Sequence, residues 1–144
     1  MAYDYSMEDY KKEQMARAFS LLPISRKKAI EICNFIRYKP IARVKKFLEG
    51  VAVKEVAVPV KRYKQGIPHR KAIGPGKFPV NASKRILSLI NSAEANAQFK
   101  GLNALNLIVK HVSAKKAPTA MHAGRFRGRK MKRCYIEVVL SEAK

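Results

Sequence analysis

The chain has 144 residues, of which 47% are hydrophobic, and this is enough for one domain with a packed core. No apolar run approaches the roughly 18 residues of a membrane-spanning helix, and the N-terminus lacks the basic and apolar regions of a signal peptide. We therefore expect a soluble, cytoplasmic protein with no membrane contact. The net charge is +21, and residues 56–136 hold 18 Lys and Arg but a single acid, Glu94. Repulsion of this size is tolerated when a polyanion supplies the negative charge, which indicates a nucleic acid as the partner.

The first residues carry no core pattern. Residues 1–14 are polar, and we interpret them as an N-terminal extension before a single globular domain over residues 15–144. This domain is predicted to open with a strand over residues 15–22, because side chains of alternating character follow one another there. One side of the strand would carry Met15, Arg17, Phe19 and Leu21.

Two amphipathic helices are predicted next. Ser25 can cap the first, which would run to about Tyr38. Pro40 would begin the second at a favourable first-turn position, and Gly50 would end it. The apolar stripes at helical spacing are Ala29, Ile32, Cys33 and Ile36 in the first helix and Ile41, Val44, Phe47 and Leu48 in the second.

Residues 51–79 fit neither a helix nor a strand. Seven Gly and Pro fall within the 21 positions from 59 to 79, and this rules out a regular helix there. A loop of this length inside a compact domain is uncommon unless it is functional. Because basic and aromatic residues are mixed along it and acids are sparse, we interpret it as a basic insertion that contacts nucleic acid.

The C-terminal half is predicted to hold the longest helix and two strands. Apolar residues at helical spacing run over residues 80–99, and Gly101 would stop this helix. Strands are predicted over residues 105–114 and 133–140. Residues 115–132 between them contain no acid and almost no aliphatic side chain, so antiparallel pairing of the strands would leave them as a cationic arm outside the globule, disordered when alone. One face of the last strand would carry Cys134, Ile136, Val138 and Leu140.

The sequence lacks the patterns of catalytic and metal sites. No carboxylate cluster suits a magnesium pair, and the three histidines lack the spacing of a zinc site. The Gly-Pro-Gly-Lys run at residues 74–77 lacks the following Ser or Thr and the preceding strand of a nucleotide-binding loop. Cys33 and Cys134 are far apart among apolar neighbours, which favours buried structural thiols over a disulfide. We expect no enzymatic activity, no cofactor and no metal.

Basic residues with interleaved aromatic rings are the candidate contacts. Arg binds phosphate in a bidentate manner and stacks on bases, and aromatic rings stack on the exposed bases of single-stranded RNA. The alternatives are a solvated helix face for Lys45 and Lys46, and a loop anchor on the core for Tyr63 and Phe78. The candidate RNA-binding residues are Arg17, Arg26, Lys27, Lys28, Lys61, Arg62, Tyr63, Lys64, His69, Arg70, Lys71, Lys77, Lys115, Lys116, Arg125, Phe126, Arg127, Arg129, Lys130, Lys132 and Arg133.

Several separate motifs, in order along the chain, resemble one protein family. They are ISRKKA at residues 24–29, EICNFIR at 31–37, VPVKRY at 58–63, GPGKFP at 74–79, SAEANA at 92–97, KGL at 100–102, HVSA at 111–114 and CYIEV at 134–138. Through them, residues 15–142 resemble the universal large ribosomal subunit protein 22 family in its archaeal and eukaryotic branch.

The resemblance implies an α+β fold in which three helices pack on a small three-stranded antiparallel sheet and one long β-hairpin projects from the body. It also implies a structural constituent of the large ribosomal subunit, which binds and organises large-subunit ribosomal RNA during assembly beside neighbouring ribosomal proteins. The hairpin would reach the wall of the nascent-peptide exit tunnel, with its tip near the nascent peptide. Two features depart from the family: Tyr38 stands where Gly is usual, and the hairpin is shorter, with the tip HAGRFRGR at residues 122–129.

Three rival functions are open at this point. A free RNA chaperone or general RNA-binding protein would use the same basic segments without a ribosomal partner. An RNA-modifying or RNA-cleaving enzyme would need a cluster of carboxylates or nucleophiles that the sequence lacks. A membrane-active cationic protein would need a helix that exposes a cationic and a strongly apolar face together, whereas the apolar faces here fit better in the core.

Overall fold

The computed structural model describes residues 5–7 and 14–143, so most of the predicted extension over residues 1–14 lies outside the described residues. Three helices and two three-stranded antiparallel sheets make up the described part, which confirms the predicted α+β class. None of its helices is long and apolar enough to span a membrane. The elements are β1 (Met15–Leu22), α1 (Arg26–Ile36), α2 (Ile41–Ala52), β2 (Val58–Pro59), β3 (His69–Arg70), β4 (Gly74–Lys77), α3 (Val80–Phe99), β5 (Leu107–Lys116) and β6 (Cys134–Glu142), with short 3-10 turns at Ala104–Asn106 and Gly124–Phe126.

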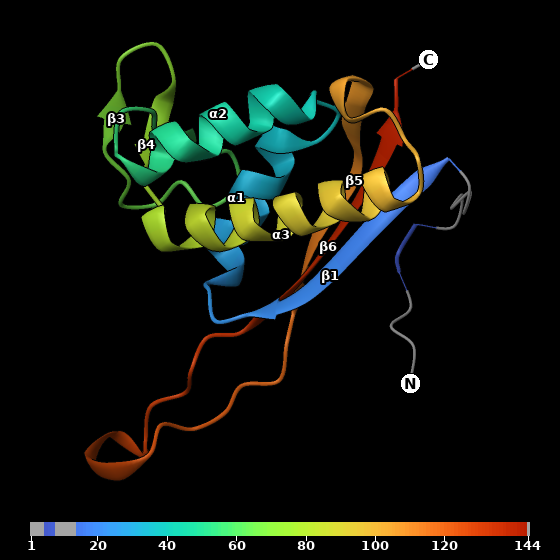
Figure 1. Ribbon diagram of the computed structural model, residues 1–144. Coiled ribbons are helices and arrows are strands. Elements are labelled where there is room, and N and C mark those ends of the chain that lie inside the picture. The colour runs from blue at the N-terminus through green and yellow to red at the C-terminus, as the bar shows by residue number, and fades with distance from the viewer. Residues whose placement is uncertain (1–4, 8–13, 144) are drawn as a thin grey trace.

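The larger sheet has the order β1-β6-β5, and α1 and α3 pack against it (Figure 1). Its central strand, β6, pairs antiparallel with both neighbours. The predicted shared face of β6 is confirmed, because its four alternate side chains are 0% exposed and lie in the main core cluster. These side chains are Cys134, Ile136, Val138 and Leu140.

The strand β1 has the predicted bounds, but its smaller side chains face the core. Ala16, Ala18 and Leu22 are buried in the core cluster, whereas Arg17 and Leu21 on the other side are exposed. Alanines at the contact leave room for α3 to pack on the strand. Alternation in the sequence therefore separated the two sides correctly, but the core side carries alanines and Leu22, while Phe19 and Leu21 lie on the other side.

The first two helices end at other residues than predicted. The helix α1 stops at Ile36 because Tyr38 adopts a left-handed conformation with φ 62°, and its backbone N–H donates to the carbonyl oxygen of Val109 at 2.8 Å. The prediction that Gly50 ends α2 is wrong, because the helix continues to Ala52. Gly50 instead provides space: a Cβ there would lie 3.1 Å from Cγ2 of Val56, which folds back over the helix.

The longest helix, α3, has the predicted bounds and the predicted C-terminal stop. Gly101 has φ 76° and donates its N–H to Gln98 at 2.9 Å, while Leu102 donates to Ala97 at 3.0 Å. This pair of hydrogen bonds is a Schellman cap, which satisfies carbonyl groups at the helix end. Across the neighbouring helix pair, Lys45 of α2 forms an ion pair with Glu94 of α3, so Lys45 has a structural partner.

The basic insertion is more ordered than the sequence indicated. Its first two residues complete α2, and the short strands β2, β4 and β3 form a second sheet in that order. This sheet lies beside α1 and α2 at one end of the molecule (Figure 1). The strands are only two to four residues long, too short for a period-2 pattern to appear in the sequence.

Gly76 lies at the centre of this small sheet, and we expect it to tolerate no side chain. A Cβ there would lie 2.9 Å from Cγ of Arg70, 3.0 Å from Cδ1 of Ile73 and 3.3 Å from Cβ of Ala57. Gly76→Ala should therefore lower the free energy of unfolding by about 1–3 kcal/mol through overpacking. Urea unfolding measures this loss, and Gly128→Ala is the control because a Cβ there meets nothing within 4 Å. Equal stability of both variants would contradict the expected crowding.

The connection between β5 and β6 projects away from the body (Figure 1). Ladder pairing ends at Lys116 and Cys134. Beyond it, residues 117–133 form a loop with a bridge between Met121 and Lys130 and a hydrogen bond of 2.9 Å from His122 N–H to the Arg129 carbonyl oxygen. The predicted arm over residues 115–132 therefore begins within β5, and beyond Lys116 the chain forms a sparsely paired loop.

Candidate nucleic-acid interface

A basic hollow lies between the start of α1 and the insertion. It has a volume of about 530 Å³. Within it, Lys27 Nζ lies 5.3 Å from the centroid of the Tyr63 ring, and Tyr63 is partly buried. Six of the predicted RNA-binding residues come together in its lining: Lys27, Lys28, Arg62, Tyr63, Lys64 and Lys77. We refer to this hollow as the insertion groove.

One buried acid fixes the wall of the insertion groove. The Glu31 carboxylate, in α1, accepts the backbone N–H groups of Lys61, Arg62 and Tyr63 at 2.9, 2.9 and 3.0 Å. Glu31 is 4% exposed, and these bonds are charge-assisted. They fix the backbone of a cationic segment, whose Lys61 and Arg62 side chains remain exposed.

The far end of the insertion presents a second set of predicted residues. His69, Arg70 and Lys71 are exposed on β3 and the turn that follows it. The Arg70 guanidinium lies 5.2 Å from the centroid of the partly buried Phe78 ring, a distance typical of a cation–π contact. This contact orients Arg70, so Phe78 supports the exposed cation.

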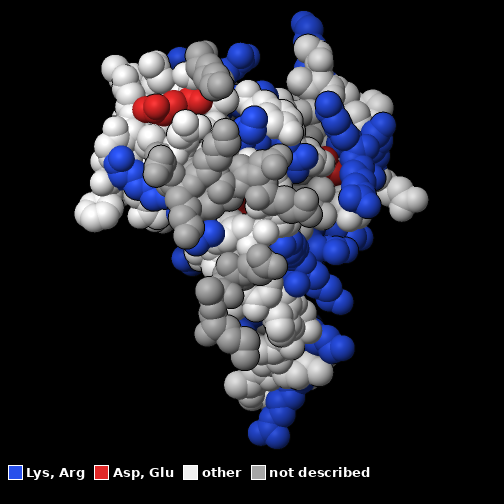
Figure 2. Space-filling model, turned by 90° about the vertical axis from the view of Figure 1, so that its right-hand side faces the viewer, with Lys and Arg blue, Asp and Glu red and all other residues white. Residues whose placement is uncertain are grey.

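The arm carries cations that have no contact with the core. Every residue from 121 to 130 is exposed, and four of these ten are Lys or Arg without an acid among them. Arg129 lies 4.8 Å from the centroid of the Phe126 ring, which is itself 53% exposed. Figure 2 shows Lys and Arg side chains along one edge, from the body to the tip of the arm. The predicted residues on the arm or at its base are Lys115, Lys116, Arg125, Phe126, Arg127, Arg129, Lys130, Lys132 and Arg133.

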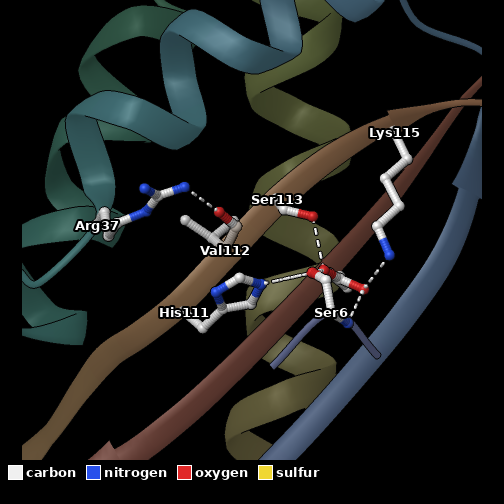
Figure 3. Close-up of polar contacts among 7 residues, drawn as sticks. Ser6, Arg37, His111, Val112, Ser113 and Lys115 are labelled. Atoms are coloured by element: carbon white, nitrogen blue, oxygen red, sulfur yellow. Dashed lines mark hydrogen bonds and ion pairs between the residues drawn. The ribbon is translucent and has the colours of Figure 1, made fainter. Parts of the chain in front are cut away.

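The base of the arm contains a buried acid that the sequence did not reveal. The Glu137 side chain on β6 is 0% exposed, and Lys115 Nζ lies 3.5 Å from its Oε2. Its Oε1 accepts from Ser113 Oγ at 2.6 Å and from Ser6 Oγ, and lies 3.0 Å from His111 Nε2 (Figure 3). Lys115 is therefore partly neutralised inside the protein and is a weaker candidate for phosphate than Lys116.

The hydrogen bonds around Glu137 determine its charge state. Burial alone would raise the pKa of its carboxyl group, but the hydrogen bonds from Ser113, Ser6 and His111 outweigh that effect and lower the pKa to about 2. The carboxylate is consequently ionised at neutral pH. Ser6 lies in the segment for which the sequence showed no core pattern, so this contact between residues 5–7 and the sheet was missed.

A second groove runs between β1 and α3, with a volume of about 1070 Å³. Arg17 lines it, as do Lys84 and Arg85, which were not among the predicted contacts. Both are exposed residues of α3, and their position off the apolar stripe of residues 80–99 was the available signal. Arg26 is exposed at the start of α1 but lines neither groove.

Few acids of the described chain face these cations freely. Glu31 accepts three backbone N–H groups, Glu94 pairs with Lys45, Glu137 lies in the network at the arm base, and Glu142 accepts the Asn103 N–H. Because these four carboxylates already have partners, they neutralise only the positive groups next to them. The field of the exposed Lys and Arg is therefore left to attract an external polyanion.

The described residues contain no group of three or more His, Cys, Asp or Glu placed to bind a metal ion. Cys33 and Cys134 are free and buried, as predicted. Burial raises the pKa of the Cys33 thiol to about 12 and that of Cys134 to about 11. Both therefore stay protonated at neutral pH, which suits packing and not nucleophilic chemistry.

The comparisons with known proteins agree with one another. Residues 18–141 match the family model described as ribosomal protein L22p/L17e. A protein of Methanopyrus kandleri named large ribosomal subunit protein uL22 is 44% identical over 79% of this chain and 75% of its own length. Proteins of the same name are 39% identical in Archaeoglobus fulgidus, over 79% of this chain and 75% of their own length, and 37% identical in Nanoarchaeum equitans, over 100% and 85%. The chain therefore belongs to the ribosomal protein L22p/L17e family.

Proposed function

We propose that this protein is a structural constituent of the large subunit of the cytoplasmic ribosome, where it binds and organises large-subunit ribosomal RNA during assembly. The observation that carries the proposal is the run of ten exposed arm residues with four cations and no acid. A segment of this kind gains nothing from burial in its own core and becomes ordered against a polyanion. The names of the relatives, which are large-subunit proteins, support the ribosome as the site.

Within this function, residues 15–144 act as one domain with two RNA-binding devices. The first is the insertion over residues 51–79, whose groove holds phosphate through Lys27, Arg62 and Lys77. The second is the arm over residues 115–132, whose Arg side chains bind phosphate and whose Phe126 stacks on a base. Arg17 and Arg26 add contacts from the body, as do His69, Arg70 and Lys71 from the small sheet. Neighbouring ribosomal proteins are the other partners.

The arm extends far enough from the body to act at a distance from it (Figure 1). We propose that it runs along ribosomal RNA to the wall of the nascent-peptide exit tunnel and that the tip at residues 122–129 meets the nascent peptide. A cationic tip beside a tunnel wall of RNA fits this position. Crosslinking from Phe126 in ribosomes stalled with a nascent chain tests it, and crosslinks to RNA far from the tunnel would contradict it.

Sedimentation of a cell lysate in 0.5 M salt tests the function as a whole. A protein that is built into the subunit should stay in the large-subunit peak, because loosely bound basic proteins are released as phosphate contacts are screened. Release to the top of the gradient would favour a free RNA-binding protein or RNA chaperone. If six to ten phosphates are neutralised, the affinity should fall about 10³- to 10⁵-fold between 50 and 200 mM salt.

We expect loss of the arm to impair assembly and leave the body folded. Replacing residues 118–132 by Asn-Gly, a two-residue hairpin turn, retains the Ala117–Arg133 hydrogen bond of 3.4 Å and removes no core side chain. The free energy of unfolding should change by less than about 0.5 kcal/mol, while incorporation into salt-washed large subunits falls strongly. Quantitative mass spectrometry of purified subunits measures the incorporation.

A variant of full length separates the charge of the arm from its shape. Changing Arg125, Arg127, Arg129 and Lys130 together to Gln should lower the slope of log affinity against log salt by about 3, since each lost phosphate contact contributes about 0.7–0.9. If this variant and the arm-deleted protein both assemble like the wild type, the role of the arm is contradicted.

A further inference from the structure

A strained aromatic residue stands at the junction of α1 and α2. Of the three described non-Gly residues with positive φ, Tyr38 alone is aromatic, with φ 62°. The left-handed conformation is costly for a residue with a Cβ and free of that cost for Gly. The junction itself is fixed by the sheet, since Tyr38 N–H donates to Val109 at 2.8 Å and Val109 N–H donates to Lys39 at 3.0 Å.

The ring of Tyr38 does not offset this strain by packing. The residue is 70% exposed, and it lies outside the core cluster. Strain that persists without a packing gain is characteristic of positions where the side chain acts on something outside the chain. Exposed rings of this kind are natural platforms for an unpaired base.

A hollow of about 520 Å³ lies beside the ring. Its wall comes from the end of α1, the junction and the strand β2. Glu31 is the one lining residue that it shares with the insertion groove. The residues of its lining that matter here are Phe35, Arg37, Tyr38, Lys39, Pro59 and Lys61. We refer to it as the junction hollow.

Cations crowd the junction hollow with little to neutralise them. Lys39 Nζ lies 3.1 Å from the centroid of the Phe35 ring, and burial, together with the charges of Arg43 and Lys61, lowers the pKa of Lys39. The one acid at the border, Glu31, is occupied by three backbone N–H groups. An anion in the hollow would relieve this repulsion.

Arg37 adds a fixed positive charge to the wall of the junction hollow. Its Nη2 donates to the carbonyl oxygen of Val112 at 2.8 Å, which fixes the guanidinium against β5 (Figure 3). Its Nε is buried and has no hydrogen-bond partner within the described chain. Nε itself is closed to ligands, but the residue is partly exposed and lines the hollow, so its positive charge adds to those of Lys39 and Lys61.

We propose that the junction hollow binds one unpaired nucleotide of RNA. The base stacks on the exposed face of Tyr38, and its phosphate lies among Lys39, Lys61 and Arg37. This site rests on the proposed RNA-binding function and adds a recognition point for single-stranded RNA, because in a duplex the base would not be free to stack. An acidic segment of a neighbouring protein is the competing occupant.

The substitution Tyr38→Gly tests the site without a risk to folding, because it relieves the strain. The melting temperature should stay equal or rise by a few degrees, while affinity for a large-subunit ribosomal RNA transcript falls about 5- to 150-fold, the range for loss of one base–aromatic stack. Filter binding measures the affinity. Tyr38→Phe should restore it, since the ring stacks without its hydroxyl group.

Salt dependence and a matched aromatic residue sharpen the test. Tyr38→Gly removes no phosphate contact and should leave the slope of log affinity against log salt unchanged, whereas Lys39→Gln should reduce it by about 0.7. Phe99→Ala is the control, because Phe99 is 94% exposed on α3 and does not line the hollow; its loss should not change the affinity.

Transcript binding by the wild type and by Tyr38→Gly separates failure of the site from failure of the proposed function. If the wild type binds the transcript tightly and Tyr38→Gly binds equally well, the site is wrong and the proposed function stands. If the wild type does not bind the transcript at all, both fail. If Tyr38→Gly binds the transcript normally but enters large subunits poorly, the occupant is a protein segment and the nucleotide proposal is overturned.

Discussion

Replacing Glu31 by Ala is expected to destabilise the protein by about 3 kcal/mol, because it removes the one carboxylate that accepts three backbone N–H groups. The carboxylate is 4% exposed and accepts the N–H groups of Lys61, Arg62 and Tyr63 at 2.9–3.0 Å. The loss is smaller than the sum of three charged hydrogen bonds, since the released loop can turn its donors toward water. In a protein of this size the melting temperature should fall by about 10 °C.

The same substitution has an unusual consequence for RNA binding. Removing an acid makes the protein more positive, which by itself would strengthen the attraction to RNA. Glu31, however, holds the backbone from which Lys61, Arg62 and Lys64 project, so Glu31→Ala should bind ribosomal RNA more weakly than the wild type. The entropic cost of ordering the loop then falls on binding instead of folding.

Glu49→Ala is the matched control, because Glu49 is an exposed helical residue whose loss changes the net charge by the same amount. It should leave the stability within about 0.5 kcal/mol of the wild type and bind RNA as well or slightly better. The stability of Glu31→Gln should lie between those of Glu31→Ala and the wild type, since one amide oxygen can accept from fewer of the three donors. If Glu31→Ala and Glu49→Ala behave alike in urea unfolding and filter binding, the anchoring role of Glu31 is refuted.

Elements with sustained periodicity could be predicted from the sequence, and elements fixed by distant contacts could not. The helix over residues 80–99 and the strand over residues 15–22 have the predicted bounds, because each presents a repeating apolar pattern to one surface. The short strands β2, β3 and β4 contain too few residues for any pattern. Gly50 illustrates the second limit, since Val56 folding back over the helix, and not a helix end, explains the glycine.

The candidate site also has parts that the sequence predicts and parts that depend on distant contacts. Composition identified the basic insertion and the arm, because charge is a local property. It did not show that Lys27 and Lys28 share a groove with residues 62–64, nor that Lys115 faces a buried acid. Both results depend on Glu31 and Glu137, which the sequence indicates only as acids beside apolar neighbours. Acids with structural roles are recognisable only once their donors, far away in the chain, are in place.

Acidification is expected to remove the contribution of Glu137 to stability. The pKa of its carboxyl group is lowered from the ordinary 4.5 to about 2 in the folded protein. A lowered folded-state pKa means that the stabilisation is fully present above pH 4.5 and is lost as the pH falls from 4.5 through 2. A shift of this size corresponds to about 3 kcal/mol at the most, in a side chain that is 0% exposed.

The comparison with Glu137→Gln isolates this effect from the general repulsion of a highly cationic protein at low pH. At pH 5 the wild type should be more stable than the variant in urea unfolding, and the difference should shrink as the pH approaches 2, where the protonated carboxyl group resembles the amide. The wild type and Glu55→Gln should show no such convergence, because Glu55 is exposed. A constant difference between the wild type and Glu137→Gln from pH 5 to pH 2 would contradict the lowered pKa.

Loss of the Glu137 charge should loosen two segments of the chain, because Glu137 contacts both Ser6 and Lys115. Oε2 of Glu137 accepts the Ser6 N–H at 3.4 Å and lies 3.5 Å from Lys115 Nζ, so one carboxylate holds the N-terminal segment and the base of the arm (Figure 3). In Glu137→Gln at pH 7, backbone amide exchange should therefore rise at Ser6 and around Lys115 together, while α3 stays protected. Increased exchange at only one of the two would show that they are held independently.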